Sequence, residues 1–80
     1  MEIIRLEVGR EAPLDSDCIN ISPIAHGKLN LTGAALCGDT SVALVSEMIF
    51  DTSELAEETG IAWANLQGVE TLYIATGKSV

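Results

Sequence analysis

The chain has 80 residues, enough for one small domain, and a chain of this length buries only about 60% of the surface that its unfolded form exposes. Twelve Asp and Glu residues against four Lys and Arg residues give a net charge of −8, which disfavours binding to nucleic acid or to anionic membranes and favours basic partners. Hydrophobic residues make up 48% of the chain, more than a small monomer easily hides, so we expect a homo-oligomer or a bound partner that covers part of this surface.

The first predicted element is a strand over residues 2–8, where the side chains alternate between two faces. Ile4, Leu6 and Val8 are expected on its better-buried face. Residues 9–17 contain glycine, proline and three acids without a repeating apolar position, which predicts an exposed loop. The chain shows no basic segment followed by a long apolar run, and no stretch long enough to span a membrane, so we expect a cytoplasmic protein without a membrane partner.

Residues 18–50 predict an antiparallel meander. Two β-like runs, at 18–22 and 28–36, flank a connection that contains proline and glycine and has a suitable length for a hairpin. Gly38 and Asp39 form a plausible tight turn before a third run, at 42–50. Because this third run is apolar on both faces, we expect it to lie centrally in the sheet.

The strongest local signal is a helix start at Asp51. The Asp51 side chain can cap the free amides of the first turn, and Glu54, three residues later, can complete a capping box. Phe50 before the cap can pack against Leu55 as a hydrophobic staple. These features predict a helix over about residues 52–67.

The expected buried face of this helix consists of side chains at helical spacing, namely Leu55, Thr59, Ala62, Trp63 and Leu66. Gly68 favours the end of the helix, and residues 69–76 resume a β-like pattern. Gly60 opens an alternative, because glycine inside a helix costs about 1 kcal/mol relative to alanine. If the helix stops there, residues 61–64 form a strand instead.

These elements predict an α+β fold over the whole chain, residues 1–80. We expect an antiparallel sheet of four to five strands, one amphipathic helix at about 52–67 packed on one sheet face, and then a final strand. The other sheet face is the expected place for dimerisation or for a partner.

Residues 52–70 also match the letter pattern of a DNA-binding helix-turn-helix, with Ala56 and Gly60 at its small positions and Leu55, Ile61, Leu66 and Val69 at its apolar positions. The chemistry does not fit DNA, because residues 51–70 hold five acids and no Lys or Arg. Only Asn65 and Gln67 in the would-be recognition helix could read bases. A DNA-binding regulator is therefore kept only as an alternative, and direct contact with nucleic acid is not expected.

The soft metal ligands of the chain are Cys18, His26 and Cys37, and their spacing forms no paired-ligand motif. We expect both cysteines to be reduced and to act as small apolar side chains. Nothing in the sequence joins a nucleophile to a base. We therefore expect no metal, no cofactor and no enzymatic activity.

The leading functional hypothesis is a non-enzymatic protein–protein interaction module whose acidic surface engages a basic protein surface. One concrete version is an inhibitor that occupies the nucleic-acid-binding groove of a larger protein, as small acidic phage-encoded anti-defence proteins do; this is an analogy from size and charge. A small structural subunit of an obligate assembly is a further alternative. The residues expected to bind the partner are Asp15, Asp17, Glu54, Glu57 and Glu58.

Overall fold

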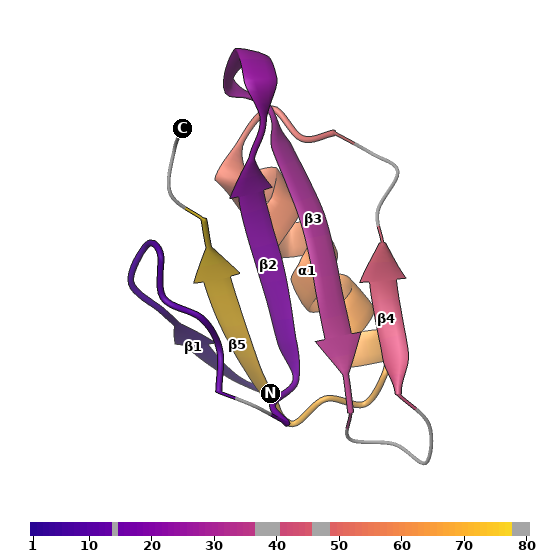
Figure 1. Cartoon of the computed structure of the whole chain (residues 1–80). Coiled ribbons are helices and arrows are strands. Elements are labelled where there is room, and N and C mark those ends of the chain that lie inside the picture. Colours follow the sequence, from indigo (N-terminus) through magenta and orange to yellow (C-terminus); the bar gives the residue numbers. More distant parts are fainter. Residues whose placement is uncertain (14, 37–40, 46–48, 78–80) are drawn as a thin grey trace.

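A computed structural model describes residues 1–13, 15–36, 41–45 and 49–77 (Figure 1). Within these ranges the chain forms one helix, one short 3-10 turn and five strands. In chain order they are β1 (Glu2–Arg5), β2 (Cys18–Pro23), η1 (Ala25–Gly27), β3 (Leu29–Ala35), β4 (Val42–Val45), α1 (Ser53–Leu66) and β5 (Thr71–Thr76).

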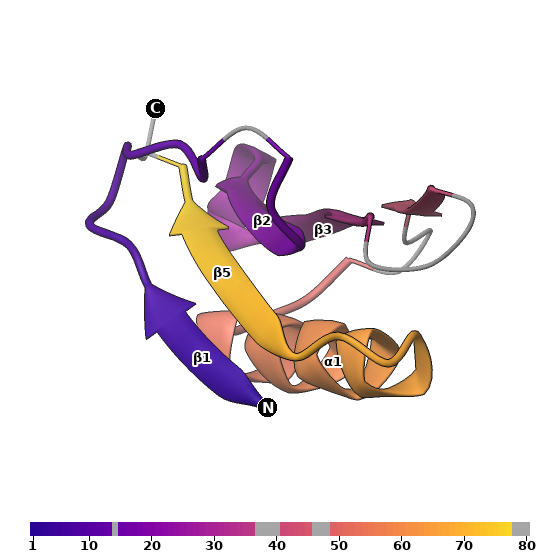
Figure 2. The ribbon, with the colours of Figure 1, turned by 90° about the horizontal axis from the view of Figure 1, so that it is seen from below.

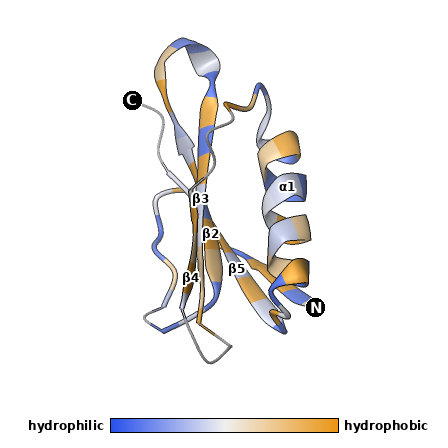
Figure 3. Cartoon of the chain, turned by 90° about the vertical axis from the view of Figure 1, so that its right-hand side faces the viewer, coloured by the Kyte–Doolittle hydropathy of each residue, from blue (hydrophilic) through white to orange (hydrophobic). Residues whose placement is uncertain are grey.

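The five strands form one sheet in the order β1-β5-β2-β3-β4. The strand that comes last in the chain, β5, lies between β1 and β2 and runs parallel to both. The pairs β2–β3 and β3–β4 are antiparallel, as the meander predicts. The α+β fold with one helix on one sheet face is therefore confirmed (Figure 3), while the sheet is mixed rather than purely antiparallel. The parallel pairing arises because α1 carries the chain back along the sheet between β4 and β5, two strands of the same direction.

The expected central position of residues 42–50 is wrong. Among the described residues of this run, Val42–Val45 form a strand, and this strand lies at the edge of the sheet beside β3. Phe50 instead makes a separate one-residue bridge in which Leu29 and Phe50 exchange two backbone hydrogen bonds of 2.9 Å. The apolar run thus belongs to two structures, an edge strand and a buried anchor before the helix. The expected turn at Gly38 and Asp39 lies outside the described residues.

The two faces of β1 are the reverse of those expected. Ile3 pairs in register with Leu72 and packs against the core, so Ile3 and Arg5 share the face that α1 covers. Ile4 lies on the other face, and Val8 is exposed beyond the end of the strand. The alternation over residues 2–8 predicts one strand, but the regular strand ends at Arg5, where its pairing with β5 ends.

The helix begins one residue later than expected. Thr52 is the N-cap, and its side-chain oxygen accepts a hydrogen bond of 3.2 Å from the Leu55 amide. Asp51 forms an ion pair with Lys28 instead. The capping box with Glu54 is therefore not formed, because box geometry requires the acid three residues after the cap.

The C-terminal end of α1 is as expected. Gly68 has a φ of +78°, and its amide donates to the Asn65 carbonyl while the Val69 amide donates to the Ala64 carbonyl, both at 3.1 Å. These two bonds form a Schellman motif, which glycine favours because the position lies in the left-handed region. The helix continues through Gly60, so the alternative strand at 61–64 does not form.

The face of α1 that packs on the sheet is made of small residues, not of the leucines. Ala56, Gly60 and Ala64 are buried, whereas Leu55 and Leu66 are 49% and 84% exposed. Sequence hydropathy favoured the larger side chains, but a helix lying close to a sheet needs small ones at the contact. The expected buried face is therefore wrong except for Trp63, which is half-buried against the core.

The core lies between α1 and the sheet and consists of apolar side chains from β2, β3 and β5 with the small residues of the helix; its largest fully buried members are Ile19, Ile21, Leu31 and Leu72. Figure 2 shows the segments 6–13 and 15–17 on the opposite side of the sheet from α1. That second face presents mostly small and uncharged polar side chains, including Asn20, Thr32 and Tyr73. In the described ranges, no helix has the length and apolar character needed to cross a bilayer.

Candidate functional site

Acidic residues gather where the three parallel strands begin. Glu2 is the first residue of β1, Glu70 directly precedes β5, and Asp15 and Asp17 lie in the last three residues before β2. Because β1, β5 and β2 are parallel neighbours, their starts lie at the same end of the sheet (Figure 1). We call this group of four acids, Glu2, Asp15, Asp17 and Glu70, the acidic end.

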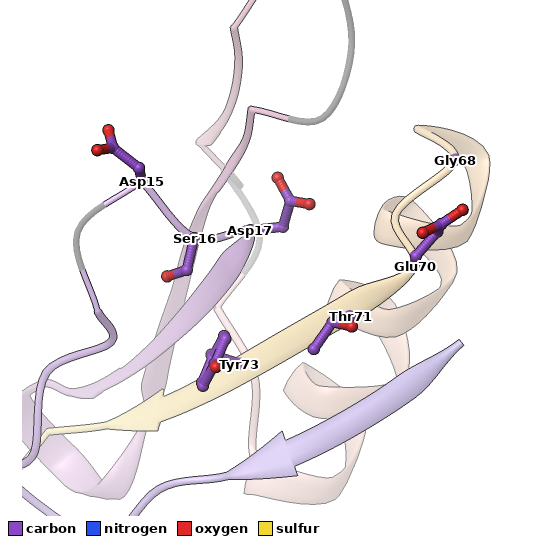
Figure 4. A pocket seen from close by; sticks show the side chains of 7 residues that line it. All are labelled: Asp15, Ser16, Asp17, Gly68, Glu70, Thr71 and Tyr73. Atoms are coloured by element: carbon purple, nitrogen blue, oxygen red, sulfur yellow. The ribbon is translucent and has the colours of Figure 1, made fainter.

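The acidic end borders a shallow open hollow of about 590 Å³. In Figure 4, the side chains of Asp17 and Glu70 project from the two segments beside the hollow, and Thr71 and Tyr73 follow β5. Glu2 stands opposite Thr71 in the strand register. The hollow is lined by Asp15, Ser16, Asp17, Gly68, Glu70, Thr71 and Tyr73.

Backbone hydrogen bonds hold the aspartate-bearing loop against the sheet. The carbonyl of Asp17 accepts from the Tyr73 amide at 3.0 Å, and its carboxylate accepts from the Leu36 amide at 2.5 Å. Asp15 has a φ of +60°, in the left-handed region that Asp tolerates better than most residues. Ser16 adds a hydrogen bond of 2.5 Å to the Pro13 carbonyl. These hydrogen bonds join the Asp17 segment to β5 and to Leu36.

The charge around the hollow is of one sign. The C-terminal end of α1 points to this end of the sheet, and its last carbonyls add a partial negative charge. Among the residues that the structure describes, no Lys or Arg lines the hollow. Elsewhere in the described ranges, three cations form ion pairs with other acids: Arg5 with Glu57, Arg10 with Glu7, and Lys28 with Asp51.

The three helix glutamates form a second group. Glu54, Glu57 and Glu58 line a hollow of about 290 Å³ together with Arg5 and Ile61. The Glu57 carboxylate accepts a hydrogen bond of 2.9 Å from the Arg5 Nε and a second bond from Nη2. Glu57 is thus engaged within the molecule, while Glu54 and Glu58 are exposed.

The five residues expected to bind a partner therefore fall into two separate groups, each lining its own hollow. The sequence interpretation missed Glu2 and Glu70, which complete the group of Asp15 and Asp17. Antiparallel pairing of β5 with its two neighbours would place Glu70 at the opposite end of the sheet. The available signal was the helix before the last strand, because such a crossover favours parallel pairing.

The considered metal ligands do not converge. Cys18 begins β2, whereas His26 lies in η1 beyond the other end of that strand, and Cys37 falls outside the described residues. Over the portion of the chain that can be described, no group of three or more His, Cys, Asp or Glu side chains could hold a metal ion. Burial raises the pKa of the Cys18 thiol above its ordinary value, which disfavours the reactive thiolate.

Residues 52–70 do not form the helix-turn-helix that their letter pattern resembles. Such a motif needs a turn near Gly60, between two helices. Residues 53–66 instead form one continuous helix, with Gly60 buried against Ile19. The small residues at 56 and 60 are explained by packing on the sheet.

Comparison of the chain with protein-family models, with curated proteins and with solved structures finds no match.

Proposed function

We propose that this protein is a non-enzymatic interaction module and that its acidic end contacts a basic surface of another protein. The observation that carries this proposal is the gathering of Glu2, Asp15, Asp17 and Glu70 beside the C-terminal end of α1, where the described residues that line the hollow include no Lys or Arg. Like charges held together destabilise the free protein, and a cationic partner relieves that repulsion.

A finer form of the proposal names the partner surface. A groove that binds nucleic acid is lined by Lys and Arg, and it accepts regularly placed anions on an ordered frame. The acidic end offers carboxylates at the starts of three neighbouring parallel strands, and hydrogen bonds from Leu36 and Tyr73 hold the Asp17 segment. In this form the protein is an inhibitor that competes with nucleic acid for the groove.

The direct test is affinity purification from the native host at two salt concentrations, followed by mass spectrometry. We expect a basic protein to be retained at about 50 mM NaCl and released at about 500 mM, because salt screens exposed charges. Retention of no basic protein at low salt would refute the proposal. Competition between the chain and nucleic acid for the purified partner then tests the inhibitor form.

Two variants with the same change in net charge locate the contact. The first carries Glu2→Gln, Asp15→Asn and Glu70→Gln, and it leaves Asp17 in place because that carboxylate binds the Leu36 amide. The matched control removes three other exposed acids through Glu11→Gln, Glu54→Gln and Glu58→Gln. We expect the first variant to lose the partner and the control to retain it. Equal losses would indicate that net charge matters and that the acidic end does not.

A further inference from the structure

The outer side of α1 carries an apolar seam that the fold does not use. Leu55, Thr59, Ala62 and Leu66 are all exposed, and the two leucines are 49% and 84% exposed. Their spacing of four, three and four residues places them along one side of the helix, as in the a and d positions of a coiled coil. We call these four residues the outer seam.

The outer seam is free because the helix packs on its own sheet with a different set of residues. Ala56, Gly60 and Ala64 face the sheet, which leaves the seam on the side turned away from it. The hydroxyl of Thr59 donates to the Leu55 carbonyl at 2.9 Å. Burial of Thr59 in an interface would therefore leave no unpaired hydroxyl donor, so the seam is chemically suited to contact with another apolar surface.

We propose that the outer seam is a homodimer interface in which the helices of two copies pack antiparallel. In that arrangement Leu55 of one copy meets Leu66 of the other, and Thr59 meets Ala62. The order large, small, small, large is the same when read from either end, as a two-fold interface requires. The small central residues allow the helices to approach closely, and the leucines close the two ends.

The distribution of charge along α1 selects the antiparallel direction and a second copy as the occupant. The acids of the helix, Glu54, Glu57 and Glu58, all lie in its first half, and the segment 61–67 has no charged side chain. Antiparallel packing places the acidic half of each helix against the neutral half of the other, and it also opposes the two helix dipoles. Parallel packing would bring the glutamates of the two copies together.

Antiparallel packing has a further consequence for residues beside the seam. Glu58 and Asn65 flank the same side of the seam and are both exposed. Seven residues apart, they are separated by roughly 10 Å along one helix, too far for a direct contact. In the antiparallel dimer, Glu58 of one copy lies beside Asn65 of the other, twice by symmetry.

The first experiment measures the mass of the protein by sedimentation equilibrium over a range of concentrations. We expect a reversible dimer with a Kd on the order of 10–100 µM, because one helix face is a small interface. Ala62→Glu should weaken the dimer at least about 100-fold, since it buries a charge at the centre. Leu66→Gln should weaken the dimer about tenfold or more, and it should not disturb the fold because Leu66 is exposed in the single chain. A wild-type monomer throughout this range, or a dimer that both variants leave intact, would overturn the proposal.

The second experiment tests direction with a matched pair of variants at one exposed position. Asn65→Lys should tighten the dimer roughly three- to tenfold by adding two ion pairs with Glu58, and Asn65→Glu should weaken it by a similar factor. Ala25→Lys, in the exposed η1 turn, makes the same change in net charge as Asn65→Lys and should change the Kd less than twofold. Equal effects of Asn65→Lys and Asn65→Glu would contradict the antiparallel packing.

Discussion

A Cβ atom added to Gly60 would fall inside the contact distance of the Ile19 side chain, because the helix lies directly on β2 at this point. Gly33 provides a similar close approach on β3, where an added Cβ would lie 2.9 Å from the Cys18 carbonyl oxygen and 3.2 Å from the Trp63 ring. Two glycines on facing elements thus set the distance between α1 and the sheet.

We therefore predict that Gly60→Ala destabilises the protein by about 1–3 kcal/mol, the usual cost of overpacking a core. At an open helix position the same change would stabilise by up to about 1 kcal/mol, so the sign is informative. Urea denaturation monitored by circular dichroism gives the free energy of unfolding. The matched control is Ala62→Gly, at an exposed position of the same helix, which should cost only about 1 kcal/mol. A stabilised Gly60→Ala variant would refute the close packing.

The N-cap assignment predicts unequal effects for two neighbouring residues. Thr52→Ala should lower the free energy of unfolding by about 1 kcal/mol, because the Leu55 amide loses its side-chain acceptor. Asp51→Ala removes only an exposed ion pair with Lys28 and should cost no more than about 0.5 kcal/mol. Thr52→Ser keeps the acceptor and should behave like the wild type. The reverse order of the two alanine variants would place the cap at Asp51.

The raised pKa of Cys18 predicts a loss of stability at alkaline pH. Desolvation by burial is the main cause of the shift, and it favours the neutral thiol in the folded state. The unfolded chain therefore releases this proton first as the pH rises. The contribution is fully present below the ordinary pKa of 9.0 and is lost as the pH rises through the folded-state value.

A Cys37→Ser background isolates this thiol, and Cys18→Ala within it serves as the control. The difference in unfolding free energy between the two proteins should fall as the pH is raised above about 9. Modification of Cys18 by a thiol reagent should also shift to higher pH in the folded state than in urea. A reaction that begins at the same pH in both states would contradict the burial of the thiol.

Repulsion within the acidic end predicts that salt stabilises the protein. Raising NaCl from about 20 mM to about 500 mM should increase the free energy of unfolding, since screening weakens the repulsion among exposed carboxylates. Glu70→Gln should stabilise the protein at low salt by a few tenths of a kcal/mol and reduce the increment due to salt. Glu11→Gln changes the net charge equally but lies outside the acidic end, so it should have the smaller effect. Equal effects would indicate general rather than local repulsion.

Local signals in the sequence predicted the helix and the last strand well. Gly68 ends α1 because its left-handed conformation completes two backbone hydrogen bonds, which depend on neighbouring residues alone. The meander of β2 and β3 likewise follows from alternation and a short connection. Such features require no knowledge of distant parts of the chain.

Long-range pairing was not encoded in any local pattern. The pairing of β1 with β5 joins Glu2 to Thr71, so neither the parallel direction nor the inverted faces of β1 could be read from residues 2–8. The same limit applies to the candidate site. Asp15 and Asp17 were found by charge, but Glu2 and Glu70 join them only through the sheet order.

Hydropathy misled the assignment of the buried helix face for a different reason. Leu55 and Leu66 have the larger apolar surfaces. The Ile19 side chain, however, fills the space between β2 and the helix, so the helix residue above it, Gly60, has no room for a side chain. The space left by the sheet, rather than the hydropathy of the helix, decides which side faces inward. Leu55 and Leu66 are consequently left on the exposed side of the helix.

The insertion of β5 between β1 and β2 governs the order in which the molecule can assemble. Within the described sheet, β1 has β5 as its strand partner, and the ribosome has already made residues 1–70 before β5 exists. The N-terminal strand must therefore wait unpaired during synthesis, and contacts between such distant residues close slowly. The acidic end forms at the same late step, so a truncated or half-folded chain does not display it.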